Sequence, residues 1–256
     1  MDLHLKGKRA IVLGGTRGIG RAIAELLVEE GVSVAICARN ENQVREAVNA
    51  LSARGGKAIG EAVDIAQGEL LRAFVSRAAQ TLAGIDIAIS NASALRTNSA
   101  PGDWQALLEV DLLGLVNLVE ASLPHLEQAA AERGDAAIVA ISSMSAVIAN
   151  RPEAYGAIKG ALIHLVKGYA RSLAKKKIRA NVISPGSIYI ADGFWGRVER
   201  ERPEAFKRTL ALNPMGRMGT PQEIAAATVF LASPRSSFTT GANLRVDGSI
   251  TEDANY

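Results

Sequence analysis

Short apolar runs, rich in Val, Ile and Ala, alternate along this chain with longer segments whose apolar residues recur every three or four positions. The short runs have the length and composition of strands, and the longer segments have the period of amphipathic helices. Strands are expected at residues 9–13, 32–37, 57–63, 85–90, 136–141 and 178–183. Helices are expected to follow them, among others at 18–30, 41–53, 69–82 and 153–175. This alternation predicts an α/β fold with a parallel sheet.

The predicted strands are apolar on both faces, which suits strands that are covered by helices on each side. Right-handed crossovers then give a doubly wound, Rossmann-like sheet, here as a single domain over residues 1–256. Residues 187–219 break the alternation, because they form a long segment that contains Phe194, Trp195 and many charges. We expect a helical substrate lid, whose basic residues either meet an acidic substrate or form its solvated face. These residues are Arg197, Arg200, Arg202, Lys207 and Arg208.

Composition narrows the class of protein. The 256 residues are 48% hydrophobic, enough for a large core. The apolar stretches end well before the roughly 20 residues of a membrane span, and no signal-peptide pattern is present, so we expect a cytoplasmic protein without a membrane partner. The net charge of +3 is modest, and we expect no nucleic-acid partner. Cys37 and the three histidines lie too far apart in the sequence for a metal-ligand spacing, so no metal site is predicted.

A glycine-rich turn follows the first predicted strand and leads directly into the first predicted helix. Glycines at such a turn let the backbone approach a pyrophosphate, while the helix N-terminus supplies unpaired N–H groups and the positive end of its dipole. The order of strand, turn and helix therefore predicts a dinucleotide site near the N-terminus. The turn is Gly14-Gly15-Thr16-Arg17-Gly18-Ile19-Gly20.

Arg39 follows the second predicted strand, at the place where an NAD-specific enzyme usually presents a carboxylate to the ribose 2′-hydroxyl. A guanidinium there, joined by Arg17 from the glycine turn, can hold a 2′-phosphate through charge-assisted hydrogen bonds. The alternative is that both arginines are simply solvated. Because they occur at two independently expected places, they favour NADP(H) over NAD.

Tyr155 and Lys159 are four residues apart and so lie on one face of a predicted helix, a spacing that by itself is common. What strengthens it is the pair Ser142 and Ser143 at the end of the preceding strand, because ligands of open α/β sheets bind at that edge. The three kinds of side chain together indicate a catalytic site.

In these motifs the chain resembles the short-chain dehydrogenase/reductase family, and particularly its ketoacyl-carrier-protein-reductase-like branch. The resemblance covers essentially the whole length. It also includes Asp64 after the third predicted strand, Asn91 after the fourth, and the segments 181–186 and 240–248. It implies a homo-oligomer, a tetramer or a dimer, that transfers hydride between NADP(H) and a small-molecule ketone or secondary alcohol.

The same resemblance implies a role for each site residue. Tyr155 would protonate the carbonyl oxygen as hydride arrives, and Lys159 would stabilise the phenolate and hold the nicotinamide ribose. A serine would hydrogen-bond the substrate oxygen. The usual gap of thirteen positions before the tyrosine fits Ser142, whereas the motif places the active hydroxyl on the second serine, Ser143. Cofactor contacts would come from Gly14, Thr16, Arg17, Gly18, Ile19, Gly20, Arg39, Asp64 (to the adenine), Asn91, Tyr155, Lys159, Gly186 and the backbone of Ile188.

Asp111 departs from the family's pattern, which commonly has an asparagine there to support a water-mediated proton relay to the lysine. An ionised aspartate accepts hydrogen bonds but cannot donate one, and it would favour a charged Lys159 if the two lie close. The threonine that usually comes a few residues after Pro185-Gly186 is also missing. Because its charge would act on a nearby Lys159, we include Asp111 among the candidate catalytic residues and expect it to alter proton delivery.

Carbonyl reduction with NADPH is the predicted activity. One alternative is an NAD(P)⁺-dependent alcohol dehydrogenase that works mainly in the oxidative direction. Another is a non-catalytic NADPH-binding regulator, which the aspartate at position 111 brings into consideration.

Overall fold

A seven-stranded sheet forms the centre of the protein, in the order β3-β2-β1-β4-β5-β6-β7. The computed structural model describes residues 2–96, 99–149 and 152–253, and every strand pair in it is parallel. From β1 the chain winds to β3 in one direction, returns to β4 beside β1, and then winds to β7 in the other. The doubly wound sheet that the sequence predicts is confirmed, with its switch point between β1 and β4. The strands are β1 (Arg9–Leu13), β2 (Ser33–Ala38), β3 (Ala58–Ala62), β4 (Ile87–Ser90), β5 (Ala136–Ile141), β6 (Ile178–Pro185) and β7 (Asn243–Val246).

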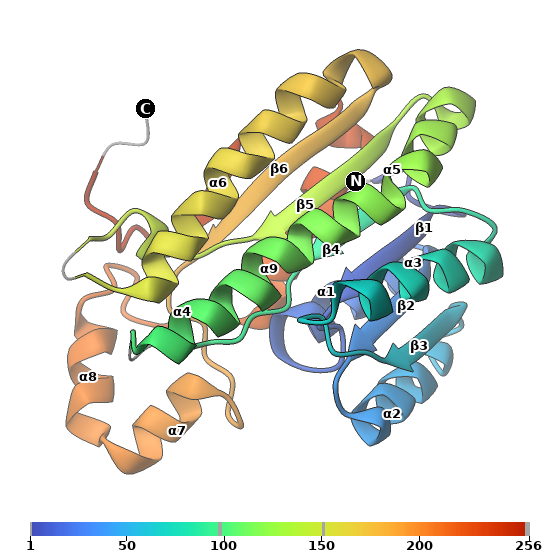
Figure 1. Cartoon of the computed structure of the whole chain (residues 1–256). Coiled ribbons are helices and arrows are strands. Elements are labelled where there is room, and N and C mark those ends of the chain that lie inside the picture. The colour runs from blue at the N-terminus through green and yellow to red at the C-terminus, as the bar shows by residue number, and fades with distance from the viewer. Residues whose placement is uncertain (1, 97–98, 150–151, 254–256) are drawn as a thin grey trace.

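Helices cover both faces of this sheet (Figure 1). One face is buried against α1 (Gly18–Glu29), α2 (Glu41–Ser52) and α9 (Pro221–Ala232). The other is buried against α3 (Gly68–Leu82), α5 (Gly114–Arg133) and α6 (Ala154–Leu173). Each face has its own cluster of fully buried Val, Ile, Leu and Ala side chains, which explains why the strands are apolar on both sides.

Shorter helices gather beyond the C-terminal ends of the strands. Figure 1 shows α7 and α8 there, on the same side as α4. The bounds are α4 (Pro101–Leu107), α7 (Phe194–Glu201) and α8 (Pro203–Ala211), with a π-helix at Leu108–Leu113 between α4 and α5. Single 3₁₀ turns occur at Met144–Ala146, Ala174–Lys176 and Pro234–Ser236. No helix in the described ranges has the length and apolar character needed to cross a membrane.

The predicted bounds of β1 and β5 are correct, and most others are right to within one or two residues. The strand predicted from residue 85 begins at Ile87. Asp86, just before it, still bonds to both neighbouring strands through its backbone, since its N–H donates to the carbonyl of Arg9 at 2.8 Å and its own carbonyl accepts from the N–H of Ala137 at 3.0 Å. Its carboxylate also accepts from the backbone N–H of Arg9 at 2.8 Å and from the Arg9 Nε at 2.6 Å. The short edge strand β7 is not among the predicted strands, since only four partly exposed residues form it.

A charged network ties α9 to the edge of the sheet away from the strand C-termini. Arg179 lies at the start of β6 and forms an ion pair with Asp135 at 2.7 Å. Its Nη1 donates to the carbonyl of Leu231 at 2.6 Å and its Nη2 to that of Ser233 at 3.0 Å, so one guanidinium satisfies carbonyls at the C-terminal end of α9. This network lies away from the C-terminal ends of the strands, where the candidate site residues are found.

Candidate active site

Every candidate motif lies at the C-terminal edge of the sheet. The glycine turn follows β1, Arg39 follows β2, Asp64 comes shortly after β3, and Asn91 follows β4. The serine pair follows β5 and Gly186 follows β6. Because β1 pairs with both β2 and β4, the glycine turn, Arg39 and Asn91 are spatial neighbours.

The backbone of the glycine turn requires glycine at several positions. Gly14 has φ +71° and Gly18 has φ +56°, both in the left-handed region. A Cβ at Gly20 would lie 2.2 Å from the carbonyl oxygen of Gly14, so helix α1 begins directly against the end of β1. The side chain of Asn91 fixes this turn from the next strand, since its Nδ2 donates to the carbonyls of Leu13 at 3.3 Å and Gly14 at 3.1 Å.

The two arginines predicted to bind a 2′-phosphate are both exposed, and neither forms an ion pair with another described residue. Arg17 precedes the first residue of α1 in an extended conformation. Half-buried Asp64, the predicted adenine contact, has one carboxylate oxygen that accepts from the N–H of Ala66 at 3.2 Å. Thr16 and Ile19 are half-buried within the turn.

Tyr155 and Lys159 lie in the first two turns of α6, as their spacing predicts. Tyr155 is half-buried, whereas Lys159 is only 2% exposed. The Lys159 Nζ lies 5.7 Å from the centre of the phenol ring and donates to the carbonyl of Ile141, the last residue of β5, at 3.0 Å. The ammonium therefore faces the ring from a fixed position between helix and strand.

Asp111 lies beside this ammonium, with its Oδ1 3.0 Å from the Lys159 Nζ. The angles at Oδ1 fall outside hydrogen-bond geometry, so we describe the contact as an ion pair. Burial lowers the pKa of Lys159, but the charge of Asp111 and, to a smaller extent, the phenol of Tyr155 raise it, and the net pKa lies above the ordinary 10.5. The structure thus brings together the two residues whose proximity the sequence left open.

The two serines have different surroundings. Ser142 is 3% exposed, and its hydroxyl donates to the backbone carbonyl of Lys159 at 2.8 Å. Ser143 is half-buried, and its oxygen accepts from the N–H of Ser145 at 3.1 Å. A hydroxyl has one hydrogen to donate, so that of Ser142 is engaged inside the protein and that of Ser143 is available to a ligand.

The segment after β6 closes over the glycine turn. A Cβ at Gly186 would lie 2.7 Å from the Cα of Asp247, so this glycine permits a close approach of two chain segments. Ile188 forms an isolated bridge with Gly219. The sequence reasoning missed Ile190, whose Cδ1 would lie 2.9 Å from a Cβ at Gly18. The sequence does contain a sign of this contact: residues 187–190, where the family usually has a threonine, include the apolar Ile190.

The segment 187–219 is mostly helical, with its aromatic side chains in contact with one another. Tyr189 packs edge-on against Phe206 and Phe194 against Trp195, at 6.1 and 5.1 Å between ring centres. All five of its basic residues singled out above are exposed. Lys207 forms an ion pair with Glu204 at 3.0 Å, on the solvent side. This exposure favours the solvated-face interpretation of the basic residues.

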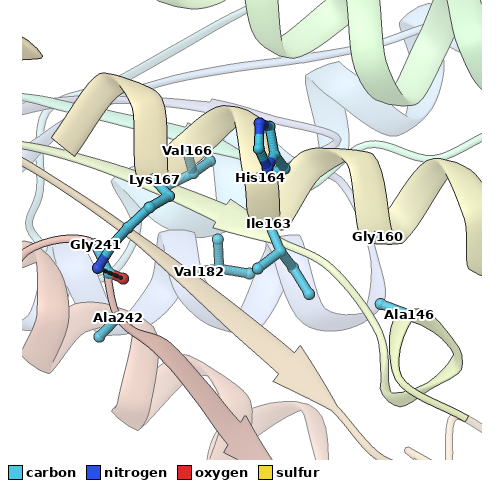
Figure 2. Close-up of a pocket in the computed structure, with 9 residues that line it drawn as sticks. All are labelled: Ala146, Gly160, Ile163, His164, Val166, Lys167, Val182, Gly241 and Ala242. Atoms are coloured by element: carbon cyan, nitrogen blue, oxygen red, sulfur yellow. Dashed lines mark hydrogen bonds between the residues drawn. The ribbon is translucent and has the colours of Figure 1, made fainter. Parts of the chain in front are cut away.

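A separate hollow of about 410 Å³ lies between α6, the strand β6 and the loop that leads into β7. Figure 2 shows Lys167 reaching from α6 across it to the carbonyl of Gly241, with which it forms a 3.1 Å hydrogen bond. The nine residues drawn there include no candidate site residue. The hollow is therefore a feature of the β7 edge and not of the candidate active site.

A protein-family model described as enoyl-(acyl carrier protein) reductase matches residues 14–251. Isoepoxydon dehydrogenase of Penicillium expansum is 35% identical over 251 residues, which cover 96% of this chain and 95% of that protein. The 3-oxoacyl-[acyl-carrier-protein] reductase of Vibrio cholerae is 32% identical, with 97% and 99% covered.

Solved structures are similar over nearly the whole chain. An NADPH-bound short-chain oxidoreductase from Pseudomonas aeruginosa PAO1, described as containing an atypical catalytic center, has 33% identity and a TM-score of 0.87, with 96% of this chain and 98% of that chain covered. L-Sorbose reductase of Gluconobacter frateurii, in complex with NADPH and L-sorbose, has 29% identity and a TM-score of 0.89, with 99% and 100% covered.

Proposed function

Because this chain belongs to the short-chain dehydrogenase/reductase family, we propose that it is an enzyme that reduces a ketone to a secondary alcohol with NADPH. The observation that carries the proposal is the position of Tyr155 and Lys159. They lie at the same sheet edge as the glycine turn, which contains Arg17 and lies beside Arg39. The site combines a proton donor, a fixed cation and a phosphate cradle, which carbonyl reduction by hydride requires.

The residues present fit NADP(H). The glycine turn has no side chain at the places where a Cβ would collide with backbone, and it leads into the N-terminus of α1. Arg17 and Arg39 have no acidic partner among the described residues, so their guanidinium groups are free to bind a 2′-phosphate. Asp64, Asn91, Gly186 and the backbone of Ile188 complete the proposed contacts.

NADPH, when bound, supplies the hydride to the carbonyl carbon. Tyr155 donates its hydroxyl proton to the carbonyl oxygen, and the cation of Lys159 stabilises the resulting phenolate. Ser143, whose hydrogen is free, donates a hydrogen bond to the same oxygen as negative charge develops there. Alcohol oxidation is the reverse, with the Tyr155 phenolate accepting the proton.

We propose that residues 187–219 form the substrate lid of a single NADP(H)-binding domain that spans residues 1–256. The apolar pair Phe194 and Trp195 opens helix α7, where it can cover an apolar part of the substrate. A cytoplasmic location stays part of the proposal.

The test is a carbonyl panel, read by the loss of reduced-cofactor absorbance with NADPH and with NADH. The names of the similar proteins direct it first to hydroxyketones such as L-sorbose and to 3-oxoacyl thioesters. Turnover of at least one ketone with NADPH is expected. Binding of NADPH with no turnover across the panel would instead support a regulator, and faster alcohol oxidation than ketone reduction at neutral pH would support the dehydrogenase alternative.

Arg39→Glu is expected to raise the KM for NADPH by about 10- to 100-fold, since a charge-assisted hydrogen bond to the 2′-phosphate becomes a repulsion. The KM for NADH should change little. Arg171→Glu is the matched control, because it makes the same charge change on an exposed residue in the last turn of α6, at the opposite edge of the sheet. Equal effects of Arg39→Glu on both cofactors would contradict a 2′-phosphate contact.

We propose in addition that the protein forms a homo-oligomer, a dimer or a tetramer, through the open edge of β7. Phe238 is fully exposed in the loop before this strand, and Leu244 on the strand is 37% exposed. An unpaired strand edge beside apolar side chains is a surface that other chains cover. Light scattering after size exclusion should give at least twice the chain mass of 26.9 kDa, and Phe238→Ser should reduce it. A wild-type monomer at micromolar concentration would contradict this proposal.

A further inference from the structure

The carboxylate of Asp111 is only 1% exposed and has a polar neighbour at each of its oxygens. One oxygen faces the Lys159 ammonium at 3.0 Å, and the other accepts from the backbone N–H of Ala94, in the loop after β4, at 2.9 Å. Asp111 lies in the π-helix between α4 and α5, which replaces a regular helical turn at this point. Such insertions are frequent at functional sites, because they reorient a side chain within an otherwise continuous helix.

Lys159 has three N–H bonds to donate. One goes to the carbonyl of Ile141 at 3.0 Å, whereas Asp111 attracts the positive charge as an ion pair, with its Oδ1 3.0 Å from the Nζ. The described partners of this ammonium are thus a backbone carbonyl and a buried carboxylate, both within the protein. The ammonium therefore still has N–H bonds to donate to the ribose of a bound nicotinamide nucleotide.

We propose that Asp111 is a positioning residue: its charge keeps the buried Lys159 protonated and, together with the Ile141 carbonyl, holds the ammonium in place, so that an N–H bond is left for the cofactor. This inference rests on the proposed function, and it assigns Asp111 a direct electrostatic task in place of a water-mediated relay. It predicts that loss of the carboxylate lowers the pH at which Lys159 loses its proton, and with it the upper pH limit of activity.

Among the described residues, Asp111 and Tyr155 are the groups whose charges act on the Lys159 ammonium, and the carboxylates on the neighbouring helical turns have partners elsewhere. Tyr155 faces the ammonium from the same helix. From the π-helix, Glu109 accepts from the Gln105 side chain at 2.5 Å, and from α4, Asp103 accepts from the backbone N–H of Ala100 at 3.1 Å and lies 3.9 Å from the Nε of Arg96. The strand β5 and the serine turn after it contribute a carbonyl and hydroxyls but no charge. Asp111 is therefore the acidic group that compensates Lys159.

Asp111→Asn removes the charge and keeps the shape of the side chain. Burial, which lowers the pKa of Lys159, is then opposed only by the smaller influence of Tyr155, so the lysine loses its proton at lower pH. We expect the alkaline limb of the pH dependence of kcat/KM to move down by about one pH unit or more. Glu109→Gln is the matched control, because it removes a carboxylate from the same π-helix and should leave the limb in place.

Thermal unfolding without cofactor or substrate gives an independent measurement. In the wild-type protein the pKa of Lys159 is raised, so the stability of the pair is complete below pH 10.5 and is lost as the pH rises through the raised value. In Asp111→Asn the unpaired ammonium destabilises the folded state until it deprotonates. The deficit in Tm relative to wild type should therefore be largest near pH 7 and shrink toward pH 10.

If Asp111→Asn does not fold at pH 7, the double variant Asp111→Asn with Lys159→Met should restore folding, because it leaves no uncompensated buried charge. The proposal is overturned if the alkaline limb stays in place, or if the Tm deficit is the same at every pH, or if the double variant is no more stable than the single one. A wild-type protein that reduces no ketone would refute the proposed function instead, and the unfolding series would still test the ion pair.

Discussion

Replacing Tyr155 with phenylalanine should lower turnover by at least about a hundredfold while NADPH affinity stays nearly unchanged. The substitution removes only the hydroxyl that donates the proton, and the ring that packs beside Leu107 and Ile158 remains. The loss should appear in kcat under saturating NADPH. Cofactor affinity is measured separately, through the change in protein fluorescence on binding.

Tyr169→Phe is the control for that variant. Tyr169 lies on the same helix and is half-buried, but it is far along α6 from the strand ends that form the site. Its turnover should equal that of the wild type. If Tyr155→Phe also retained wild-type turnover, a group other than Tyr155 would have to be the proton donor.

Ser143→Ala should lower kcat/KM by about a hundredfold, the scale of one lost hydrogen bond to a developing oxyanion. The prediction follows from the free hydrogen of this hydroxyl, whose oxygen is fixed by the N–H of Ser145. Stability should change little, because the side chain is half-buried and its hydroxyl donates to no described group.

Ser142→Ala should show the opposite pattern. The substitution removes the buried hydrogen bond to the carbonyl of Lys159, so the free energy of unfolding should fall by about 1 kcal/mol while kcat stays within a few-fold of wild type. Measuring denaturant unfolding and kcat/KM for both variants separates the two serines. A severe loss of kcat/KM in Ser142→Ala, with Ser143→Ala active, would reverse our assignment.

The sequence predicted the parts of this protein that depend on local pattern. The apolar runs of β1 and β5 were bounded correctly, and the sheet edge that collects the candidate residues followed from the strand order. The choice between the two serines could not be made in this way. Neighbouring residues at a strand end point to opposite sides, and only the packing of α6 decides which side is the site.

The partners of Lys159 were also beyond a local pattern. Asp111 precedes Lys159 by 48 positions, and the contact depends on a π-helix that the spacing of apolar residues did not predict. The same holds for Ile141, which acts through its backbone carbonyl and so could have had almost any side chain. Such contacts are set by how elements pack, and a pattern of residue types carries little information about them.

The side-chain amide of Asn91 fixes the shape of the glycine turn before any ligand binds. Because this side chain holds the carbonyls of Leu13 and Gly14, the conformational entropy of the turn is lost when the chain folds and not when the cofactor binds. Less of the binding free energy is then used to order the protein. We therefore expect Asn91, which holds two carbonyls at the end of the neighbouring strand, to increase cofactor affinity through preorganisation.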